Sequence, residues 1–130
     1  CNVCEEENGW RAALNLVTFD GKVEAYAKGL RNAVFMTMHP VTGQIWVTEM
    51  GRDLLGDDLP PDEINIVHYR KHYGWPYCYV HNGEVKPDVS QKWLRDPAAC
   101  ALVPTPDAII PAHAAPLGEN AQMCVPARAP

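Results

Sequence analysis

The chain has 130 residues, yet it contains a single serine, Ser90, and no apolar run longer than the six residues Ala98–Val103. A membrane-spanning helix needs about 20 apolar residues, so we expect no membrane span. The 11 lysines and arginines are scattered and the net charge is −5, which leaves no basic stripe to neutralise phosphate groups. Nucleic acid is therefore not an expected partner.

Several catalytic motifs are missing as well. Ser90 lies between Val89 and Gln91, so the G-x-S-x-G nucleophile elbow of serine hydrolases is absent. The sequence has no glycine-rich loop of the kind that holds phosphate groups. The five histidines do not fall at a metal-binding spacing such as H-E-x-x-H, and each is expected to be structural or exposed: His39, His68, His72, His81 and His113.

Short strands separated by turn residues are the main pattern between residues 11 and 79. Leu14–Phe19 and Lys22–Ala27 flank Asp20-Gly21, a dipeptide typical of hairpin turns. No segment keeps the i, i+3, i+4, i+7 period of an amphipathic helix over three turns, so we predict an all-β fold. Further β-branched, apolar or aromatic runs predict strands at residues 34–38, 45–48, 64–69 and 72–79.

Prolines are distributed unevenly, since eight of the 12 lie at or after Pro87. Long helices and central strands are therefore excluded from an irregular, proline-rich C-terminal third. Upstream of it, the order of strand, tight turn, strand and polar loop is typical of a β-propeller blade, but a closed ring needs at least ~4 blades. The chain is too short for a ring, so we predict a partial β-propeller. Its start at Cys1 fits a fragment or a processed N-terminus.

Five cysteines allow several kinds of site. The C-x-x-C spacing of Cys1 and Cys4 suits a zinc half-site, a redox pair or a local disulfide. A disulfide between Cys78 and Cys100 would close a proline-rich excursion with little core of its own, and it would stabilise the fold by ~3 kcal/mol. That bond implies an oxidising compartment. The alternative is that Cys78 and Cys100 are buried, reduced thiols.

Six carboxylates and Arg52 lie within the loop from Glu49 to Glu63. Such loops offer oxygen ligands to Ca²⁺, although the spacing is not that of an EF-hand. Alternatively, the acids are solvated and pair with Arg52, or two of them form a glycosidase acid and base. An aromatic series nearby either stacks on a sugar or cofactor ring or forms the core face of a strand: Tyr69, Tyr73, Trp75, Tyr77 and Tyr79.

Four segments in the same order and spacing resemble the glucose/sorbosone dehydrogenases: Gly29–Ala33, Ile45–Asp53, Gly56–Asn65 and Tyr73–Tyr79. These are six-bladed β-propellers that use pyrroloquinoline quinone (PQQ) together with Ca²⁺. Cys1–Glu6 and Pro111–Gly118 are similar to the sorbosone-dehydrogenase-like branch of the family. The resemblance predicts a partial propeller domain of about two blades at residues 1–118, followed by a divergent, poorly ordered tail at residues 119–130.

The resemblance implies roles for a few residues only. Arg31 and Asn32 match the Arg-Asn pair that contacts the quinone, and Arg31 would stabilise the negative charge that develops as hydride arrives. Gly51 and Arg52 match two residues whose backbone carbonyls bind the Ca²⁺ of the cofactor. Met50 stands at a cofactor-binding position where soluble glucose dehydrogenases carry a glutamine. The acids of Asp62–Asn65 belong to a shared motif and are expected to order the loop.

The implied parent protein is a PQQ- and Ca²⁺-dependent sugar dehydrogenase of aldose or sorbosone type, an oxidoreductase with a sugar substrate and a separate electron acceptor. The family takes its histidine base from an earlier blade and further lysine and arginine side chains from later ones, so the isolated chain is expected to be inactive. An extracytoplasmic location, periplasmic or secreted, is expected. The alternatives are a non-enzymatic propeller scaffold or ligand-binding module and a small secreted domain stabilised by disulfides.

Overall fold

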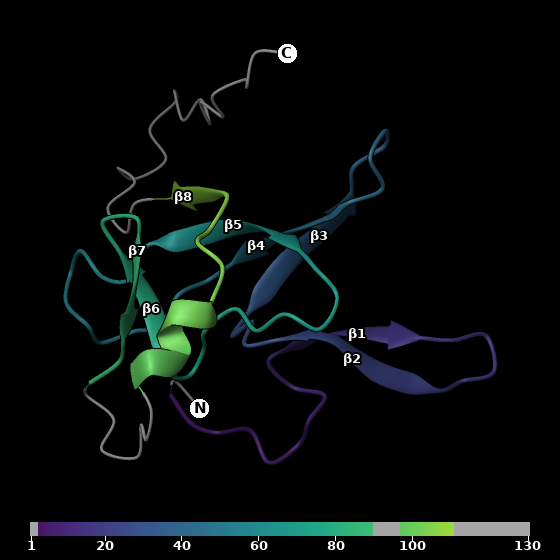
Figure 1. Ribbon diagram of the computed structural model, residues 1–130, viewed down its shortest axis with the longest axis horizontal. Coiled ribbons are helices and arrows are strands. Elements are labelled where there is room, and N and C mark those ends of the chain that lie inside the picture. Colours follow the sequence, from purple (N-terminus) through teal and green to yellow (C-terminus); the bar gives the residue numbers. More distant parts are fainter. Residues whose placement is uncertain (1–2, 90–96, 111–130) are drawn as a thin grey trace.

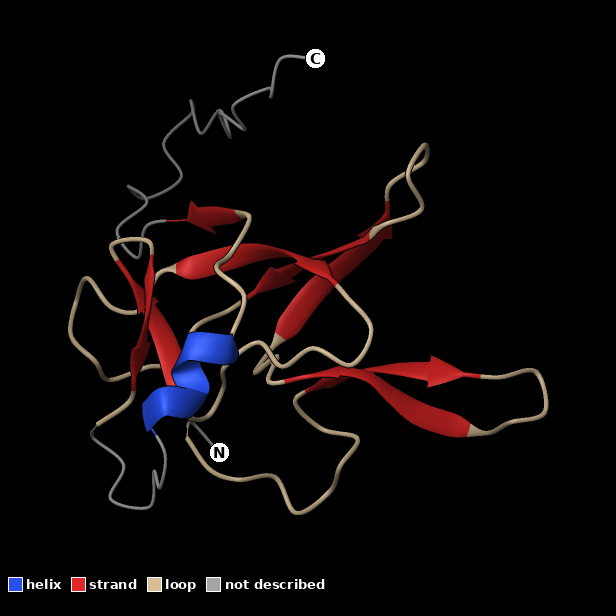
Figure 2. Cartoon of the chain, in the orientation of Figure 1, coloured by secondary structure: helices blue, strands red, loops and turns tan. Residues whose placement is uncertain are grey.

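The computed structural model describes residues 3–89 and 97–110 of the chain (Figure 1). Three small antiparallel sheets account for its strands, as expected of an all-β protein (Figure 2). The elements in chain order are β1 (Ala13–Val17), β2 (Val23–Lys28), β3 (Ala33–Met38), β4 (Ile45–Glu49), β5 (Asp62–Val67), β6 (Cys78–His81), β7 (Glu84–Pro87), the 3-10 helix η1 (Pro97–Leu102) and β8 (Ala108–Ile110).

The largest sheet has four strands in the order β3-β4-β5-β8, all antiparallel. This is the meander of one propeller blade, with residues 68–107 inserted before the outermost strand. The β1–β2 hairpin precedes it as a separate sheet, and β6–β7 forms a third sheet inside the insertion (Figure 1). The predicted partial β-propeller is therefore confirmed.

The first hairpin forms where its turn residues predict it. Gly21 has φ +82°, a backbone conformation that glycine adopts without steric cost. Its N–H donates to the Thr18 carbonyl at 2.9 Å, and the Thr18 N–H donates to the Lys22 carbonyl at 2.8 Å. Two strands can therefore pair in register from Val17 and Val23 outward, with one irregularity between Leu14 and Asn15.

The core lies where the end of β2 meets the inner faces of β4 and β5. It consists of Ala27, Leu30, Val47, Val67 and Tyr73, with Leu14, Tyr26 and Ile45 packed against it. The strand β3 contributes nothing to this core, because all six of its residues are exposed. The four-stranded sheet is thus held to the rest of the described chain through its central strands.

The expectation of a strand over residues 72–79 is wrong, because only Cys78 and Tyr79 of that segment belong to a strand. Gly74 has φ +110°, and its carbonyl accepts the N–H groups of Tyr77 and Cys78 at 2.8 and 3.0 Å, which makes a turn. Pro76 lacks an N–H and cannot donate to a strand ladder. Tyr73 and Trp75 are nevertheless buried, so these two aromatic residues pack as a loop rather than as one face of a strand.

A disulfide fixes the insertion, since Cys78 at the start of β6 is bonded to Cys100 in η1 with a Cα–Cα distance of 5.8 Å. The disulfide interpretation of this pair is thereby confirmed. Cys4 is disulfide-bonded as well, so it is not available as a thiolate ligand for zinc. Within the described residues no helix is long and apolar enough to cross a membrane. The predicted domain boundary after residue 118, the motif at 111–118 and the tail at 119–130 lie outside the described residues.

Candidate functional site

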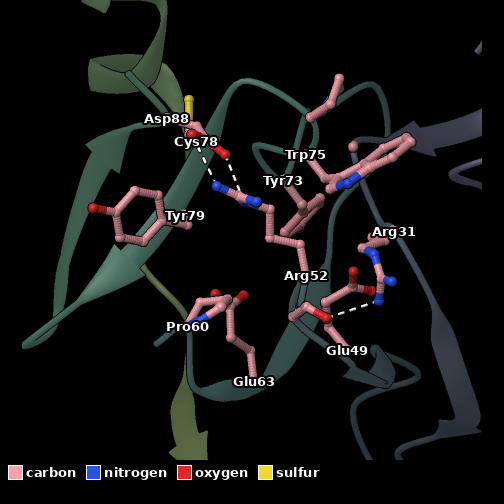
Figure 3. Close-up of a pocket in the computed structure, with 13 residues that line it drawn as sticks. Arg31, Glu49, Arg52, Pro60, Glu63, Tyr73, Trp75, Cys78, Tyr79 and Asp88 are labelled. Atoms are coloured by element: carbon pink, nitrogen blue, oxygen red, sulfur yellow. Dashed lines mark hydrogen bonds and ion pairs between the residues drawn. The ribbon is translucent and has the colours of Figure 1, made fainter. Parts of the chain in front are cut away.

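The Arg31 side chain connects the segment before β3 to the loop after β4. Its Nη1 donates to the Gly51 carbonyl oxygen at 2.7 Å and to the Met50 carbonyl oxygen at 3.5 Å. Its Nη2 lies 3.2 Å from Asp53 Oδ2. Only 16% of the Arg31 side chain is exposed, so the guanidinium is held at the wall of a cavity rather than extended into solvent (Figure 3).

Asn32 is held by three groups at the end of β4. Its backbone N–H donates to Glu49 Oε1 at 3.1 Å, and its carbonyl accepts the Met50 N–H at 3.1 Å. Its side-chain amide lies 3.7 Å from the Met50 sulfur, which is a weak acceptor. The structure thus brings together four of the residues that the resemblance singles out: Arg31, Asn32, Met50 and Gly51.

Both backbone polar groups of Gly51 form hydrogen bonds. Its carbonyl accepts from Arg31, and its N–H donates to Asp62 Oδ1 at 3.1 Å. A Cβ at this position would lie 2.6 Å from Pro60 Cγ, so the absence of a side chain is required by packing inside the loop. Asp62 therefore orders the loop from the first position of β5, in agreement with the role expected from its motif.

The Arg52 guanidinium does not face Arg31 but is directed into the insertion. Its Nε lies 2.6 Å from Asp88 Oδ2, its Nη2 lies 3.2 Å from Asp88 Oδ1, and both side chains are more than nine-tenths buried. Sequence reasoning did not find Asp88, because 36 residues separate the partners and no local motif links them. If Arg52 contributes to a site, it does so through its backbone, since its side chain has this structural role.

Glu49 and Glu63 are paired in the β4–β5 register, and their side chains line the same cavity (Figure 3). Burial raises the pKa of Glu49 to about 8, against the opposing effect of the Asn32 N–H. Burial also raises the pKa of Glu63 to about 7, although an N–H of Asn65 donates to its carboxylate at 3.1 Å. Among the residues that the structure describes, none forms a hydrogen bond with Glu49 Oε2.

A small cavity of about 30 Å³ lies between these groups, lined among others by Arg31, Glu49, Arg52, Glu63 and Trp75. This is room for one or two water molecules. The two glutamates were predicted only as members of an acidic loop. The signal that could have identified Glu49 is its place two residues after Val47, which puts both on the same face of a strand.

The donor set matches the PQQ cofactor better than it matches Ca²⁺. A guanidinium and an amide suit an anionic, planar, oxygen-rich group. By contrast, the described residues contain no cluster of three or more His, Cys, Asp or Glu side chains that could hold a metal ion. The loop carboxylates have separate partners: Glu49 bonds Asn32, Asp53 pairs with Arg31 and Asp62 bonds Gly51. A calcium ion could use backbone carbonyls here, but Arg31 would first have to leave the Gly51 oxygen.

Comparison with known proteins identifies the family of the chain. Residues 9–103 match the Glucose / Sorbosone dehydrogenase family. The chain belongs to this family. The glucose/sorbosone dehydrogenase match covers the β1–β2 hairpin, β3 to β7 and η1, and therefore all of the candidate site residues.

Similar proteins extend well beyond the length of this chain. An uncharacterised protein of Borreliella burgdorferi is 37% identical over 111 residues, covering 82% of this chain and 26% of that protein. An uncharacterised protein of Synechocystis is 32% identical over 79 residues, or 57% of this chain and 18% of the relative. A solved structure of a Trichoderma reesei carbohydrate-active enzyme of family AA12 superposes with a TM-score of 0.59 at 21% identity, over 72% of this chain and 30% of that one. The chain thus spans about a quarter of the first relative and a third or less of each of these proteins.

Proposed function

We propose that the chain forms part of the cofactor site of a PQQ- and Ca²⁺-dependent sugar dehydrogenase. The observation that carries the proposal is the contact between Arg31 Nη1 and the Gly51 oxygen at 2.7 Å, because it joins the two segments to which family resemblance assigns cofactor contacts. Arg31 and Asn32 would hold the quinone, with Met50 beside them, and the carbonyls of Gly51 and Arg52 would hold Ca²⁺ once Arg31 has moved from the Gly51 oxygen to the quinone. The family assignment supports the general reaction class.

When bound, PQQ supplies a two-electron acceptor for hydride from a sugar hydroxyl or hydrated aldehyde. The Arg31 guanidinium, which Asp53 Oδ2 holds at 3.2 Å, would present positive charge to the quinone oxygens, where negative charge develops. The Asn32 amide can exchange the Met50 sulfur for a better acceptor, since a thioether is a weak one. The Glu49 carboxyl accepts the Asn32 backbone N–H and so positions this residue.

The isolated chain is proposed to be inactive, because the general base and the remaining cofactor contacts belong to other blades of the parent protein. That parent would require a sugar substrate and a separate electron acceptor. The Cys78–Cys100 disulfide supports an oxidising, extracytoplasmic location, since structural disulfides persist mainly in such compartments.

The proposal is tested by titrating the purified chain with PQQ in the presence of Ca²⁺ and following cofactor fluorescence. We expect saturable binding that is about tenfold weaker in Arg31→Ala, the effect of losing one charge-assisted hydrogen bond. Arg11→Ala removes an exposed arginine outside the site and serves as the control. Equal PQQ binding by Arg31→Ala and the unsubstituted chain would refute the assignment of Arg31 to the cofactor site. Sugar-dependent dye reduction by the isolated chain would refute its proposed inactivity.

A second candidate is a non-enzymatic propeller module that no longer binds the cofactor. It is favoured by one observation: the residue beside the Asn32 amide is Met50, whose thioether cannot donate a hydrogen bond, where the resemblance expects a glutamine. The substitution Met50→Gln restores the glutamine that the resemblance expects at this position. If the unsubstituted chain fails to bind PQQ and the Met50→Gln variant binds it, the non-enzymatic module is the correct interpretation.

A further inference from the structure

The strand β3 lies at one edge of the four-stranded sheet. It pairs with β4 on one side, and among the residues that the structure describes no strand covers its other side (Figure 1). Such an edge presents unpaired N–H and C=O groups that can pair with another strand. Proteins commonly protect it with lysine, proline or inward-pointing charges, and the β3 sequence AVFMTM contains none of these. Its one irregularity lies between Ala33 and Phe35, so β3 is regular from Phe35 to Met38.

The hydrogen bonds toward β4 show which backbone groups of β3 lie at the open edge. The Phe35 N–H donates to the Thr48 hydroxyl at 3.1 Å, and the His39 N–H donates to the Gln44 carbonyl at 2.8 Å, both on the β4 side. The backbone groups of successive residues in a strand point to opposite edges. Met36, one residue after Phe35, therefore directs its N–H and C=O groups toward the open edge.

The side chains of β3 are apolar and exposed. Val34, Phe35, Met36 and Met38 are 50, 73, 61 and 65% exposed, respectively. At roughly 150–200 Å² for a large apolar side chain, these residues expose about 400–500 Å² in each copy of the chain. Two copies that covered these residues would bury about 800–1,000 Å², before backbone atoms are counted, and a specific interface needs about 1,000 Å². The open edge is therefore large enough for a reversible dimer.

The charge distribution also favours contact at this place. The net charge of the chain is −5, so two copies repel each other over most of their surface. However, no Lys, Arg, Asp or Glu occurs between Arg31 and Glu49, the segment that contains the whole β3–β4 hairpin. Arg31 itself is paired with Asp53. The hairpin is thus a surface on which two copies can meet without opposing like charges.

We propose that two copies of the chain form a symmetric dimer in which the β3 strands pair antiparallel and join the two four-stranded sheets. Residues with backbone groups at the open edge must face each other in such a pair, which a two-fold axis through Met36 achieves. The axis places Met36 opposite Met36 of the second copy, Phe35 opposite Thr37, and Val34 opposite Met38. These pairs are apolar apart from the Thr37 hydroxyl, and the dimer requires neither PQQ nor Ca²⁺.

The first test is sedimentation velocity of the full chain, without PQQ or Ca²⁺, over a wide range of concentrations. We expect a reversible shift from monomer to dimer as the concentration rises. Met36→Lys should weaken dimerisation at least about tenfold, because two like charges would then lie directly opposite each other. Phe19→Lys is the matched control. Phe19 is fully exposed between β1 and β2, so this substitution adds the same charge away from β3 and should leave dimerisation unchanged.

The second test is cross-linking, which identifies the register and does not require that Met36→Lys folds. Residues directly opposite each other in a hydrogen-bonded pair have Cα atoms about 5.5 Å apart, a distance that a disulfide spans. Met36→Cys should therefore give a disulfide-linked dimer on mild oxidation. Phe35→Cys is the control, because two cysteines at position 35 would lie diagonally, about 7–8 Å apart, beyond the reach of a disulfide. The unsubstituted chain, oxidised in the same way, gives the background from the native cysteines.

Three results would overturn the proposal. The first is a chain that stays monomeric at every concentration, which would mean that a second copy does not cover this edge. The second is a Met36→Lys variant that folds and dimerises as strongly as Phe19→Lys. The third is disulfide cross-linking at position 35 that equals cross-linking at position 36. PQQ takes no part in these measurements, so this proposal and the proposed function fail or succeed separately.

Discussion

Arg52 and Asp88 form a buried ion pair with contacts of 2.6 and 3.2 Å, and it joins the loop after β4 to the end of β7. Asp88 is itself placed by its N–H, which donates to the Tyr77 carbonyl at 2.8 Å. The pair therefore ties the candidate cofactor loop, which precedes β5 (Asp62–Val67), to the insertion, which follows β5. Through it, residues far apart in sequence determine where the Gly51 and Arg52 backbone lies.

Asp88→Ala should destabilise the chain by about 3–5 kcal/mol, because it leaves the Arg52 guanidinium buried without its counter-charge. The measurement is the free energy of unfolding from urea denaturation. Glu84→Ala, which removes the carboxylate of the exposed Glu84–Lys86 pair, is the matched control and should change stability little. Equal effects of the two substitutions would show that the buried pair has no special role.

Glu63 should make stability depend on pH. Its pKa is raised from 4.5 to about 7, so between these values the unfolded chain releases a proton that the folded chain keeps. Folding stability is therefore highest below pH 4.5 for this group, and it falls as the pH rises through 7, by up to about 3 kcal/mol. Glu63→Gln should flatten this part of the stability profile, measured by denaturation at pH 5 and pH 8.5. The exposed Glu7→Gln should leave the slope unchanged, and an unaltered slope in Glu63→Gln would contradict the prediction.

Removing the Cys78–Cys100 disulfide should cost ~3 kcal/mol of stability, because the bond limits the entropy of the unfolded chain over a separation of 22 residues. The double substitution Cys78→Ala and Cys100→Ala, compared with the parent chain under oxidising conditions, isolates this bond from the disulfide of Cys4. Urea denaturation gives the difference. A double variant as stable as the parent would mean that packing of η1, not the bond, holds the insertion.

Gly51→Ala should destabilise the loop by about 1–3 kcal/mol, since the new Cβ would lie 2.6 Å from Pro60 Cγ and 3.1 Å from the Pro61 carbonyl oxygen. Gly9→Ala is the control, because nothing lies within 4 Å of a Cβ there. Thermal unfolding of both variants measures the difference. If Gly51→Ala is as stable as Gly9→Ala, the loop adapts and glycine is not required by packing.

Local sequence was sufficient for much of the fold and for part of the site. The Asp20-Gly21 dipeptide gave the first hairpin because its conformation depends on its own backbone. The strand predicted over residues 72–79 from its alternating aromatic residues does not form, because Gly74 and Pro76 interrupt the hydrogen-bond ladder. Arg31 and Gly51 were found through motif order, whereas Asp88 was not, because its role depends on contact with Arg52 across 36 residues.

Turn dipeptides, short apolar runs and the absence of a helical period determined by themselves that the chain is a short-stranded β protein, and the scattered lysines and arginines leave it no stripe of positive charge. Turn residues, strand periods and prolines act over a few neighbouring residues, so they can be interpreted without a structure. The tertiary structure alone decided that Glu49 and Glu63 are paired in register, that Arg52 pairs with Asp88 and that Arg31 reaches the Gly51 carbonyl. Those relationships depend on register and on packing between distant segments, which no local pattern encodes.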